Sequence, residues 1–382
     1  MTLRLDLDRM AAPAAVAEAP LTPPHAARER LAQWLLGDEP QLALGRHAGA
    51  VVGWVDARGR ADYAYPEITG YYLRWLAWQA ACGRDSSALA PRAEAAQRWL
   101  RSWIESAPLP RTRVYLHGPR ADWRNHALFC FDLAMALRGV GSAAARGLVE
   151  PDPVVVERFC GALERLVGDD GLFDAYAALD AGYPMPDRWS TRRGAFLAKP
   201  AAGILIAARE LPGVPESLVR CALRTFGAAL DWMVQEPHDE VHAQMYAIEG
   251  LLGCPEHPRF AATLAAIDIA FCKLLERCAA LGRVPEMKSA DGCPRNDVVA
   301  QVLRIAALLH GHGFTRGAEH QIVRSLSRRL TESLSPAGAI AFDSSAGPLQ
   351  YNTWTAMFTE QALALRQPGA VRERTSLASL LV

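Results

Sequence analysis

Two carboxylates, Glu67 and Asp297, occupy positions from which they could transfer protons to a bound substrate. Each falls in the first turn of an expected helix, Glu67 directly after Pro66 and Asp297 directly after Asn296. A pair of carboxylates across a cleft is the minimum equipment for cleaving a glycosidic bond, and such a pair also serves proton abstraction in lyases and epimerases. The competing explanation is helix capping, because proline, asparagine and acidic residues favour helix starts for structural reasons.

His242 and Tyr246 form a second candidate acid/base pair. They are four residues apart, so on a helix they stack one turn above the other. The competing explanation is a structural histidine that packs against the tyrosine ring.

Both pairs belong to a larger pattern in which six stretches place three residues at positions i, i+4 and i+7. This spacing stacks side chains in one column on a helix, and each column leads into small and apolar residues. That arrangement is not typical of a surface helix, and it predicts six helices that line a central funnel. The triplets are Glu67/Tyr71/Arg74, Asn125/Phe129/Asp132, Arg192/Phe196/Lys199, His242/Tyr246/Glu249, Asp297/Gln301/Arg304 and Trp354/Phe358/Gln361.

The triplets predict three layers in the funnel. The first members form a polar rim, and the middle members form a mostly aromatic layer that either packs as core or stacks on a sugar ring. The last members nearly alternate in charge. Because unpaired buried charge is costly, we expect Asp132 to pair with Arg74 or Lys199, and Glu249 to pair with Lys199 or Arg304.

Cations and aromatic rings crowd the expected rim and supply candidate substrate-binding residues. Helix N-termini carry partial positive charge, and together with arginines they favour an anionic ligand. The arginines could instead pair with nearby aspartates, and the rings could instead brace the loops. The candidates are Arg124, Arg192, Arg295, Trp189 and Trp354, with Gln301 from the middle layer.

Helical periodicity gives the elements that must position these residues. Amphipathic segments alternate with the triplet-bearing ones, which predicts an outer and an inner layer and hence an all-α (α/α)6 toroid of six helical hairpins. Short extended loops precede most inner helices. The expected helices are 24–36, 67–82, 89–106, 124–140, 152–168, 192–209, 215–234, 239–253, 257–281, 296–311, 317–334 and 352–366. We expect a poorly ordered segment at 1–23, one toroid domain at 24–368 and a tail at 369–382.

Composition excludes several classes of protein. The 41 basic and 41 acidic residues cancel, which argues against a nucleic-acid partner. The eight cysteines lack zinc spacing and suggest no disulfide framework. No secretion signal and no apolar run of about 18 residues stand out, so we expect a cytoplasmic protein without membrane insertion. Nucleotide, dinucleotide and zinc-protease motifs are missing, and no cofactor is predicted.

Three blocks, YPEITGYYLRWL, RNDVVAQVLRIAALL and YNTWTAMFTEQALAL, resemble the signature blocks of VpsJ-like proteins. These are bacterial α/α-toroid proteins associated with exopolysaccharide biosynthesis, and they are similar to the six-hairpin glycosidase-like superfamily. The resemblance spans roughly residues 50–367. It implies the toroid fold and site residues at the motif positions Glu67, Tyr71, Arg295, Asp297, Asn352 and Trp354.

The sequence therefore predicts a carbohydrate-active protein of the six-hairpin glycosidase-like type, foremost a glycoside hydrolase-like enzyme, that acts on an acidic saccharide or another small anion. Glu67 and Asp297 would be the acid/base pair, with His242 and Tyr246 as helpers or substitutes. Hydrolysis, elimination and epimerisation stay open. The alternatives are a non-catalytic saccharide-binding or scaffold protein, whose rim carboxylates would be paired to arginines, and an isoprenoid cyclase or transferase, which needs a deep apolar cavity.

Overall fold

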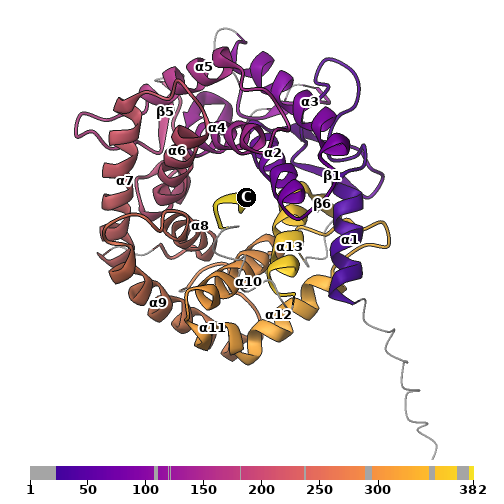
Figure 1. Cartoon of the computed structure of the whole chain (residues 1–382), viewed down its shortest axis with the longest axis vertical. Helices are drawn as coiled ribbons and strands as arrows, with labels where there is room; N and C mark the ends of the chain where they lie inside the picture. Colours follow the sequence, from indigo (N-terminus) through magenta and orange to yellow (C-terminus); the bar gives the residue numbers. More distant parts are fainter. Residues whose placement is uncertain are drawn as a thin grey trace, which may run out of the picture.

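The helices of the computed structural model form two concentric rings (Figure 1). The model describes residues 23–106, 111–118, 120, 122–180, 182–235, 238–288, 295–343, 349–367 and 378–382. The inner ring consists of α2 (Pro66–Ala81), α4 (Cys130–Ala145), α6 (Ala198–Glu210), α8 (Val241–Leu252), α10 (Asn296–Gly311) and α13 (Thr353–Leu365). The outer ring consists of α1 (Pro24–Leu35), α3 (Ser86–Ile104), α5 (Pro153–Glu164), α7 (Glu216–Gln235), α9 (Phe260–Leu281), α11 (Thr315–Glu319) and α12 (Gln321–Glu332). The predicted (α/α)6 toroid is confirmed.

Burial in the two rings follows the sequence pattern. Outer helix α12 buries Ile322, Val323, Leu326 and Leu330 on one face, at helical spacing. Inner helix α10 buries every residue from 296 to 309, because neighbours in both rings and the filled centre cover it. No described helix combines the length and the apolar character that a membrane span requires, and none of the seven described cysteines forms a disulfide.

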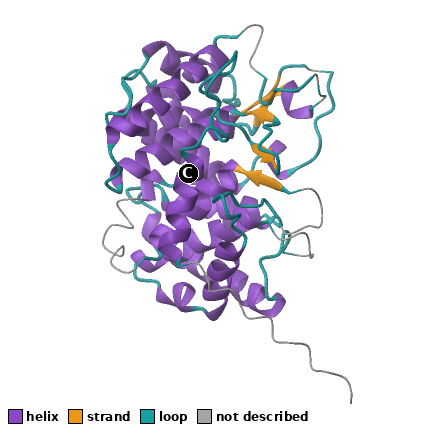
Figure 2. Cartoon of the chain, turned by 90° about the vertical axis from the view of Figure 1, so that its right-hand side faces the viewer, coloured by secondary structure: helices purple, strands orange, loops and turns teal. Residues whose placement is uncertain are grey.

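Short antiparallel strand pairs gather at one end of the toroid, where the inner helices begin (Figure 2). The pairs are β1 (Trp54–Asp56) with β6 (Gln350–Asn352), β2 (Tyr63–Ala64) with β3 (Val114–Tyr115), and β4 (Ala127–Phe129) with β5 (Tyr176–Ala178). The β1–β6 pair joins the first and last hairpins, with Trp54 opposite Asn352. Helix α1 also packs on α13, so the ring closes between segments far apart in the sequence.

Glycines let neighbouring inner helices approach backbone to backbone. A Cβ atom on Gly139 of α4 would lie 2.2 Å from the carbonyl oxygen of Gly70 on α2, and one on Gly250 of α8 would lie 2.3 Å from the backbone nitrogen of Lys199 on α6. Any side chain at either glycine would force these helices apart. The first approach brings Glu67 toward the start of α4, and the second brings Lys199 toward Glu249.

Two inner helices begin six residues later than the sequence predicted. Helix α4 begins at Cys130 rather than at 124, and α6 begins at Ala198 rather than at 192. The 3-10 turn η1 (Trp123–His126) and strand β4 precede α4, while η2 (Trp189–Thr191) and η3 (Ala195–Leu197) precede α6. The Asn125 side-chain amide accepts a hydrogen bond from the backbone N–H of Arg113 at 2.7 Å and donates one to its carbonyl oxygen at 3.0 Å. Asn125 therefore holds a loop in place and does not start a helix. The other predicted helices are present within about a turn of their expected bounds.

Four buried cations, which we call the cationic floor, lie in the ring below its aromatic layer. They are Arg74, Arg138, Lys199 and Arg304, one each from α2, α4, α6 and α10. Glu249 of α8 pairs with Lys199, with 2.8 Å between Nζ and Oε2, and with Arg304. Burial lowers the pKa of Lys199 to about 8 and that of Arg138 to about 10. Among the described residues Glu249 pairs with two of these cations, and Glu210 lies near Arg138, so positive charge exceeds negative charge around the floor.

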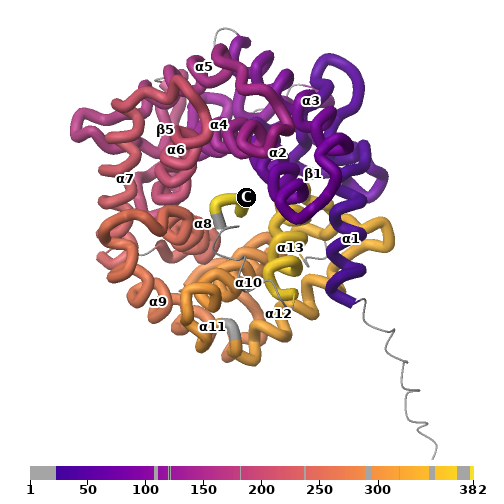
Figure 3. The backbone as a smooth tube through the Cα atoms, viewed as in Figure 1, coloured from indigo at the N-terminus to yellow at the C-terminus, as the bar shows by residue number. Residues whose placement is uncertain are grey.

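The last described residues, 378–382, lie in the centre of the ring, against the cationic floor (Figure 3). The carbonyl oxygen of Ser379 accepts hydrogen bonds from Arg74 and Arg138, and that of Val382 accepts from Lys199 (3.1 Å) and Arg304 (2.9 Å). Backbone carbonyls thus solvate part of the excess charge. The tail expected at 369–382 therefore ends inside the ring; residues 369–377, and the segment 1–22, lie outside the described residues.

The predicted pairing of Glu249 with Lys199 or Arg304 is confirmed, but the predicted pairing of Asp132 is wrong. Asp132 lies two residues into α4, at the rim, and its Oδ1 atom accepts from the Tyr65 hydroxyl. Because α4 starts late, Arg138 occupies the floor position expected for Asp132.

Replacing Glu249 with alanine should destabilise the protein by about 3–5 kcal/mol, because it leaves Lys199 and Arg304 buried without their counter-charge. Urea denaturation of wild type and variant measures the free energy of unfolding. Glu216→Ala is the control, since its pair with Arg220 is exposed at 3.7 Å and should contribute nothing measurable. Equal stability of Glu249→Ala and wild type would contradict a buried ionised Glu249.

Candidate functional site

A cavity of about 320 Å³ opens where the inner helices begin. That volume lies at the small end of ligand pockets, which run from roughly 300 to 1,000 Å³. Its walls combine side chains from the starts of α2, α4, α8 and α13 with residues of the strand-bearing loops. The lining includes Trp54, Tyr65, Glu67, Arg113, Trp123, Arg124, Phe131, Asp132, Arg188, Trp189, Glu240, His242, Tyr246, Glu286, Arg295 and Trp354.

Glu67 and Asp132, which we call the carboxyl pair, both line this cavity, and their charges interact directly. Both are more than nine-tenths buried. The Tyr65 hydroxyl donates to Oδ1 of Asp132 at 3.2 Å, while Oδ2 meets no N–H or O–H donor in the described structure. Two ionised carboxylates in this position would repel each other, which favours one proton shared by the pair, and Oδ2 of Asp132 is the atom that lacks a donor.

Burial and the neighbouring negative charge keep that proton on the carboxyl pair. Burial, reinforced by Glu67, raises the pKa of Asp132 well above its ordinary value, and burial also raises the pKa of Glu67. The pair titrates as a unit, and both shifts favour the protonated form of a carboxyl group.

The pKa of His242 shifts so that this residue loses a proton rather than keeping one. Burial, reinforced by the positive charge of Arg295, lowers its pKa to about 4, so the imidazole is neutral at neutral pH. Its Nδ1 atom lies 2.8 Å from Oε1 of Gln301, and its ring packs against Trp189 and Tyr246. The cavity therefore combines two carboxyl groups with raised pKa values and a neutral imidazole.

Asp297 is completely buried and fully engaged. Arg295 donates two hydrogen bonds to it, at 3.1 and 2.7 Å, and the Trp354 indole donates a third at 3.1 Å. Burial alone would raise the pKa of Asp297, but Arg295 holds it below its ordinary value. An ionised carboxylate held in this way is suited to orienting Arg295 and Trp354 at the cavity wall.

The cavity arginines differ in their availability. Arg113 and Arg124 both pair with Asp122, at 3.1 and 3.2 Å, and Arg295 is held by Asp297. The guanidinium of Arg188 makes no ion pair within the described residues and is exposed at the cavity mouth. Arg188 is thus the arginine best placed to meet an anionic group.

Aromatic rings form much of the remaining wall. Trp54 and Trp354 stack with their centroids 6.3 Å apart, and Trp189 stands edge-on to Phe196 at 5.0 Å. Large rings of this kind offer flat apolar faces beside polar groups.

The structure brings together most, but not all, of the predicted site residues. Glu67, His242, Tyr246, Arg124, Trp189, Arg295 and Trp354 line the cavity, and Asp297 lies directly behind it. The other predicted substrate contacts do not line it. Arg192 is exposed and pairs with Asp187, Asn352 caps α13 through Thr355, Tyr71 lies in the aromatic layer below, and Gln301 lies behind His242.

Sequence reasoning missed Asp132 as a cavity residue, together with Arg113, Glu240 and Glu286. The spacing of Phe131 and Arg138, seven residues apart as Glu67 and Arg74 are, was the available signal for the true register of α4. The other three lie on loops, where periodicity carries no information.

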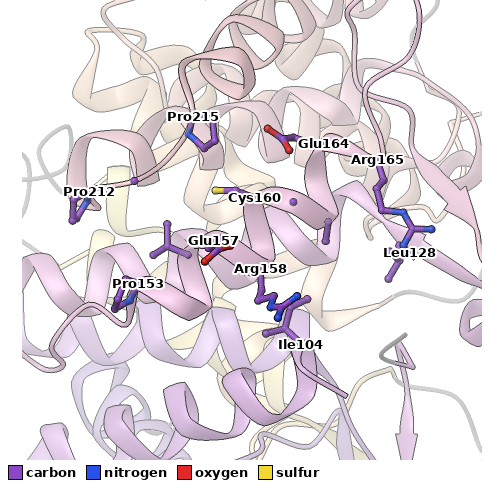
Figure 4. A pocket seen from close by; sticks show the side chains of 14 residues that line it. Ile104, Leu128, Pro153, Glu157, Arg158, Cys160, Glu164, Arg165, Pro212 and Pro215 are labelled. Atoms are coloured by element: carbon purple, nitrogen blue, oxygen red, sulfur yellow. The ribbon is translucent and has the colours of Figure 1, made fainter. Parts of the chain in front are cut away.

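Larger hollows lie outside the ring but do not gather acid/base groups in this way. One of about 500 Å³ lies over α5, and most of its side chains, including Glu157, Cys160 and Glu164, come from that single helix (Figure 4). Another, of about 570 Å³ and mostly apolar, lies between α7, α8 and α9. The rim cavity is therefore the candidate site on chemical grounds, not by size.

Several solved structures share this fold at low sequence identity. A D-mannose isomerase matches with a TM-score of 0.66 and 15% identity, covering 89% of this chain and 96% of that chain. Cellobiose 2-epimerase from Bacillus thermoamylovorans B4167 gives 0.65 and 10%, covering 89% and 98%. An unsaturated glucuronyl hydrolase specific for heparin gives 0.61 and 11%, covering 90% and 95%. No protein-family model and no curated protein sequence matches the chain. The structural similarity shows a shared six-hairpin toroid fold.

Asp132→Asn should gain stability relative to wild type as the pH rises above about 4, the ordinary carboxyl pKa. Over that window the folded wild type binds more protons than the unfolded chain, so its free energy of unfolding falls with rising pH. Asparagine keeps a donor to Glu67 and removes this titration. Urea denaturation across the pH range measures the difference. A difference that stays constant with pH would show that Asp132 is ionised in the folded protein.

Proposed function

We propose that this protein is a carbohydrate-active enzyme that moves a proton at a carbon next to the carbonyl group of a saccharide, as an isomerase or epimerase does. The observation that carries the proposal is that one cavity is lined by Asp132, a buried carboxyl whose pKa is raised, and by His242, an imidazole whose pKa is lowered to about 4. An acid and a base that coexist at neutral pH are what such proton transfer requires.

The geometry favours proton transfer over glycosidic cleavage by two carboxylates. Glycosidase carboxyl groups stand about 5–9.5 Å apart, with the sugar or a water between them. Glu67 and Asp132 are close neighbours whose charges interact directly, so we do not expect a sugar to lie between them. Asp297 has its oxygens occupied by Arg295 and Trp354, so its predicted role in proton transfer would require that cluster to open.

In the proposed reaction the Nε2 atom of His242 removes the proton from the carbon beside the carbonyl. Asp132 donates its proton to the carbonyl oxygen, which gives a neutral enediol. For isomerisation, His242 then returns its proton to the neighbouring carbon, and the hydroxyl on the carbon that lost its proton gives its own proton to Asp132 as the new carbonyl forms. For epimerisation, the enediol must first turn its opposite face to His242, which returns the proton to the same carbon while the original oxygen gives its proton back to Asp132. Glu67 accepts the hydrogen bond of Asp132 and serves as its proton reservoir.

The walls suit a sugar with an acidic group. Trp54, Trp189 and Trp354 can stack on the apolar face of a pyranose ring, and Arg188 can form charge-assisted hydrogen bonds with a carboxylate. The names of the structural neighbours support this class, since two are an isomerase and an epimerase and a third is a glucuronyl hydrolase. A role in exopolysaccharide biosynthesis rests on the resemblance of the signature blocks.

A non-catalytic saccharide-binding protein is the second candidate, and the pairing of Asp297 with Arg295 favours it. Against it, the carboxyl pair is not held by arginine. A cyclase is disfavoured, because the cavity is small and lined by four arginines and four acidic side chains.

Proton NMR of candidate sugars in D₂O tests the function. Reducing neutral sugars and reducing uronic acids are incubated with the protein, and the signal of the proton beside the carbonyl is followed. The proposal predicts its exchange for deuterium, with a new isomer or epimer formed. Binding without exchange for every sugar would support the saccharide-binding alternative instead.

Glu67→Gln and Asp132→Asn should each reduce turnover by ~10²–10⁴-fold, the usual contribution of a general acid or base. Both changes preserve shape, so the fold and ligand binding should persist. Glu216→Gln, on the exposed face of α7, is the matched control. Wild-type turnover in both cavity variants would show that the carboxyl pair takes no part in the reaction. Asp297 would then be the next candidate, and Asp297→Asn is the corresponding test.

Arg188→Ala should raise KM for uronic acids by about tenfold or more while leaving KM for neutral sugars nearly unchanged, because it removes one charge-assisted contact. Arg192→Ala is the control, four residues away, exposed and outside the cavity. Steady-state kinetics on matched acidic and neutral sugars distinguish the two variants. An equal effect of Arg188→Ala and Arg192→Ala would contradict a specific anion contact.

A further inference from the structure

Glu249 is an acceptor in every hydrogen bond it makes. Its side chain is 3% exposed, and it contacts Lys199 and Arg304. Burial alone would raise the pKa of Glu249, but the two cations hold it below its ordinary value. The group is therefore ionised, and an ionised carboxylate has no proton to donate.

The Glu249 carboxylate decides which way the Gln301 amide points. The end of Gln301 that lies 3.3 Å from Oε2 of Glu249 must be its NH₂ group. Its oxygen then points the opposite way, at Nδ1 of His242, 2.8 Å distant. A flipped amide would set its oxygen against the carboxylate and its NH₂ against the histidine, and would lose the first hydrogen bond.

The Gln301 oxygen in turn decides where the proton of His242 lies. An amide oxygen only accepts, so Nδ1 must carry the hydrogen, and Nε2 keeps its lone pair. We infer that Gln301 and Glu249 are positioning residues that hold His242 in the tautomer whose bare Nε2 is free to act as a base in the cavity. The catalytic consequence rests on the function proposed above, but the tautomer does not.

The other charged groups around His242 act in the same direction. Asp297, from the start of α10, lies 4.0 Å from Nδ1 and favours a hydrogen there. Arg295, from the preceding loop, and Lys199, from α6, both oppose a second proton on the ring. Trp189 and Tyr246 pack on the ring and limit its rotation.

The chain of contacts extends below the cavity. Lys199 and Arg304, which hold Glu249, also donate to the carbonyl oxygen of Val382. The cationic floor and the segment 378–382 thereby fix the first link, although none of these groups lines the cavity. Gln301 was predicted to contact the substrate. In the structure it lies one layer below the cavity, between His242 and Glu249.

Nitrogen-15 NMR of histidine-labelled protein tests the inference without any substrate. The signals of His242 are identified by their loss in His242→Gln. His238 is an internal reference, because its Nε2 atom accepts from the backbone of Phe196 at 3.2 Å and does not depend on Gln301. We expect wild-type His242 to show a protonated Nδ1 and a bare Nε2. A hydrogen on Nε2 in the wild type would overturn the inference.

Two variants test the positioning chain. Gln301→Met keeps the length of the side chain and removes both hydrogen bonds, and Glu249→Gln keeps the shape and allows the Gln301 amide to flip. Each should yield a mixture of His242 tautomers while His238 stays unchanged. A folded Gln301→Met with the wild-type tautomer would overturn the inference, even if Glu249→Gln fails to fold.

Kinetics separate this inference from the proposed function. With a sugar that exchanges its proton, Gln301→Met should lower kcat by ~10–100-fold, the usual cost of losing a group that orients another, with KM little changed. A change in KM alone would indicate that Gln301 contacts the substrate instead of positioning His242. If the tautomer shifts as expected but no sugar exchanges with wild type, the positioning chain stands and the proposed function fails.

Discussion

The cationic floor is the constraint on which the rest of this structure depends. Buried charge is tolerated only where partners are held in good geometry, so Glu249, Lys199 and Arg304 fix α6, α8 and α10 relative to one another at the centre of the ring. The same cations hold the segment 378–382 in that centre. The toroid therefore has a closed end and an open end, and the open end is where the inner helices begin.

Residues at the closed end of the toroid determine how His242 is oriented at the open end. Glu249 orients Gln301, and Gln301 orients His242. On the opposite side of the cavity, the contact of Gly70 with Gly139 brings α2 and α4 together. That approach places Glu67 and Asp132 close enough to share a proton. In the proposed reaction, burial and packing thus keep Asp132 protonated as the acid and Nε2 of His242 unprotonated as the base. The proposed steps use no metal.

Sequence periodicity was sufficient to predict the toroid, its inner helices and the cavity positions of Glu67, His242 and Tyr246, because buried columns repeat at helical spacing. It misplaced α4 and α6, because Asn125 and the residues after Arg192 have helix-compatible spacing but are held in loops by backbone hydrogen bonds and strand pairing. Asp132 was therefore assigned to the floor instead of the rim. The direct contact between Glu67 and Asp132 depends on how two helices approach, which no single-helix pattern contains.

Neutron diffraction from crystals of the deuterium-exchanged protein at neutral pH would test the central claim most directly, because it locates the protons. The account predicts one deuteron between Oδ2 of Asp132 and the Glu67 carboxylate, one on Nδ1 of His242 and none on Nε2. A bare Asp132 beside a doubly protonated His242 would contradict it, since the cavity would then hold a carboxylate and an imidazolium in place of an acid and a base.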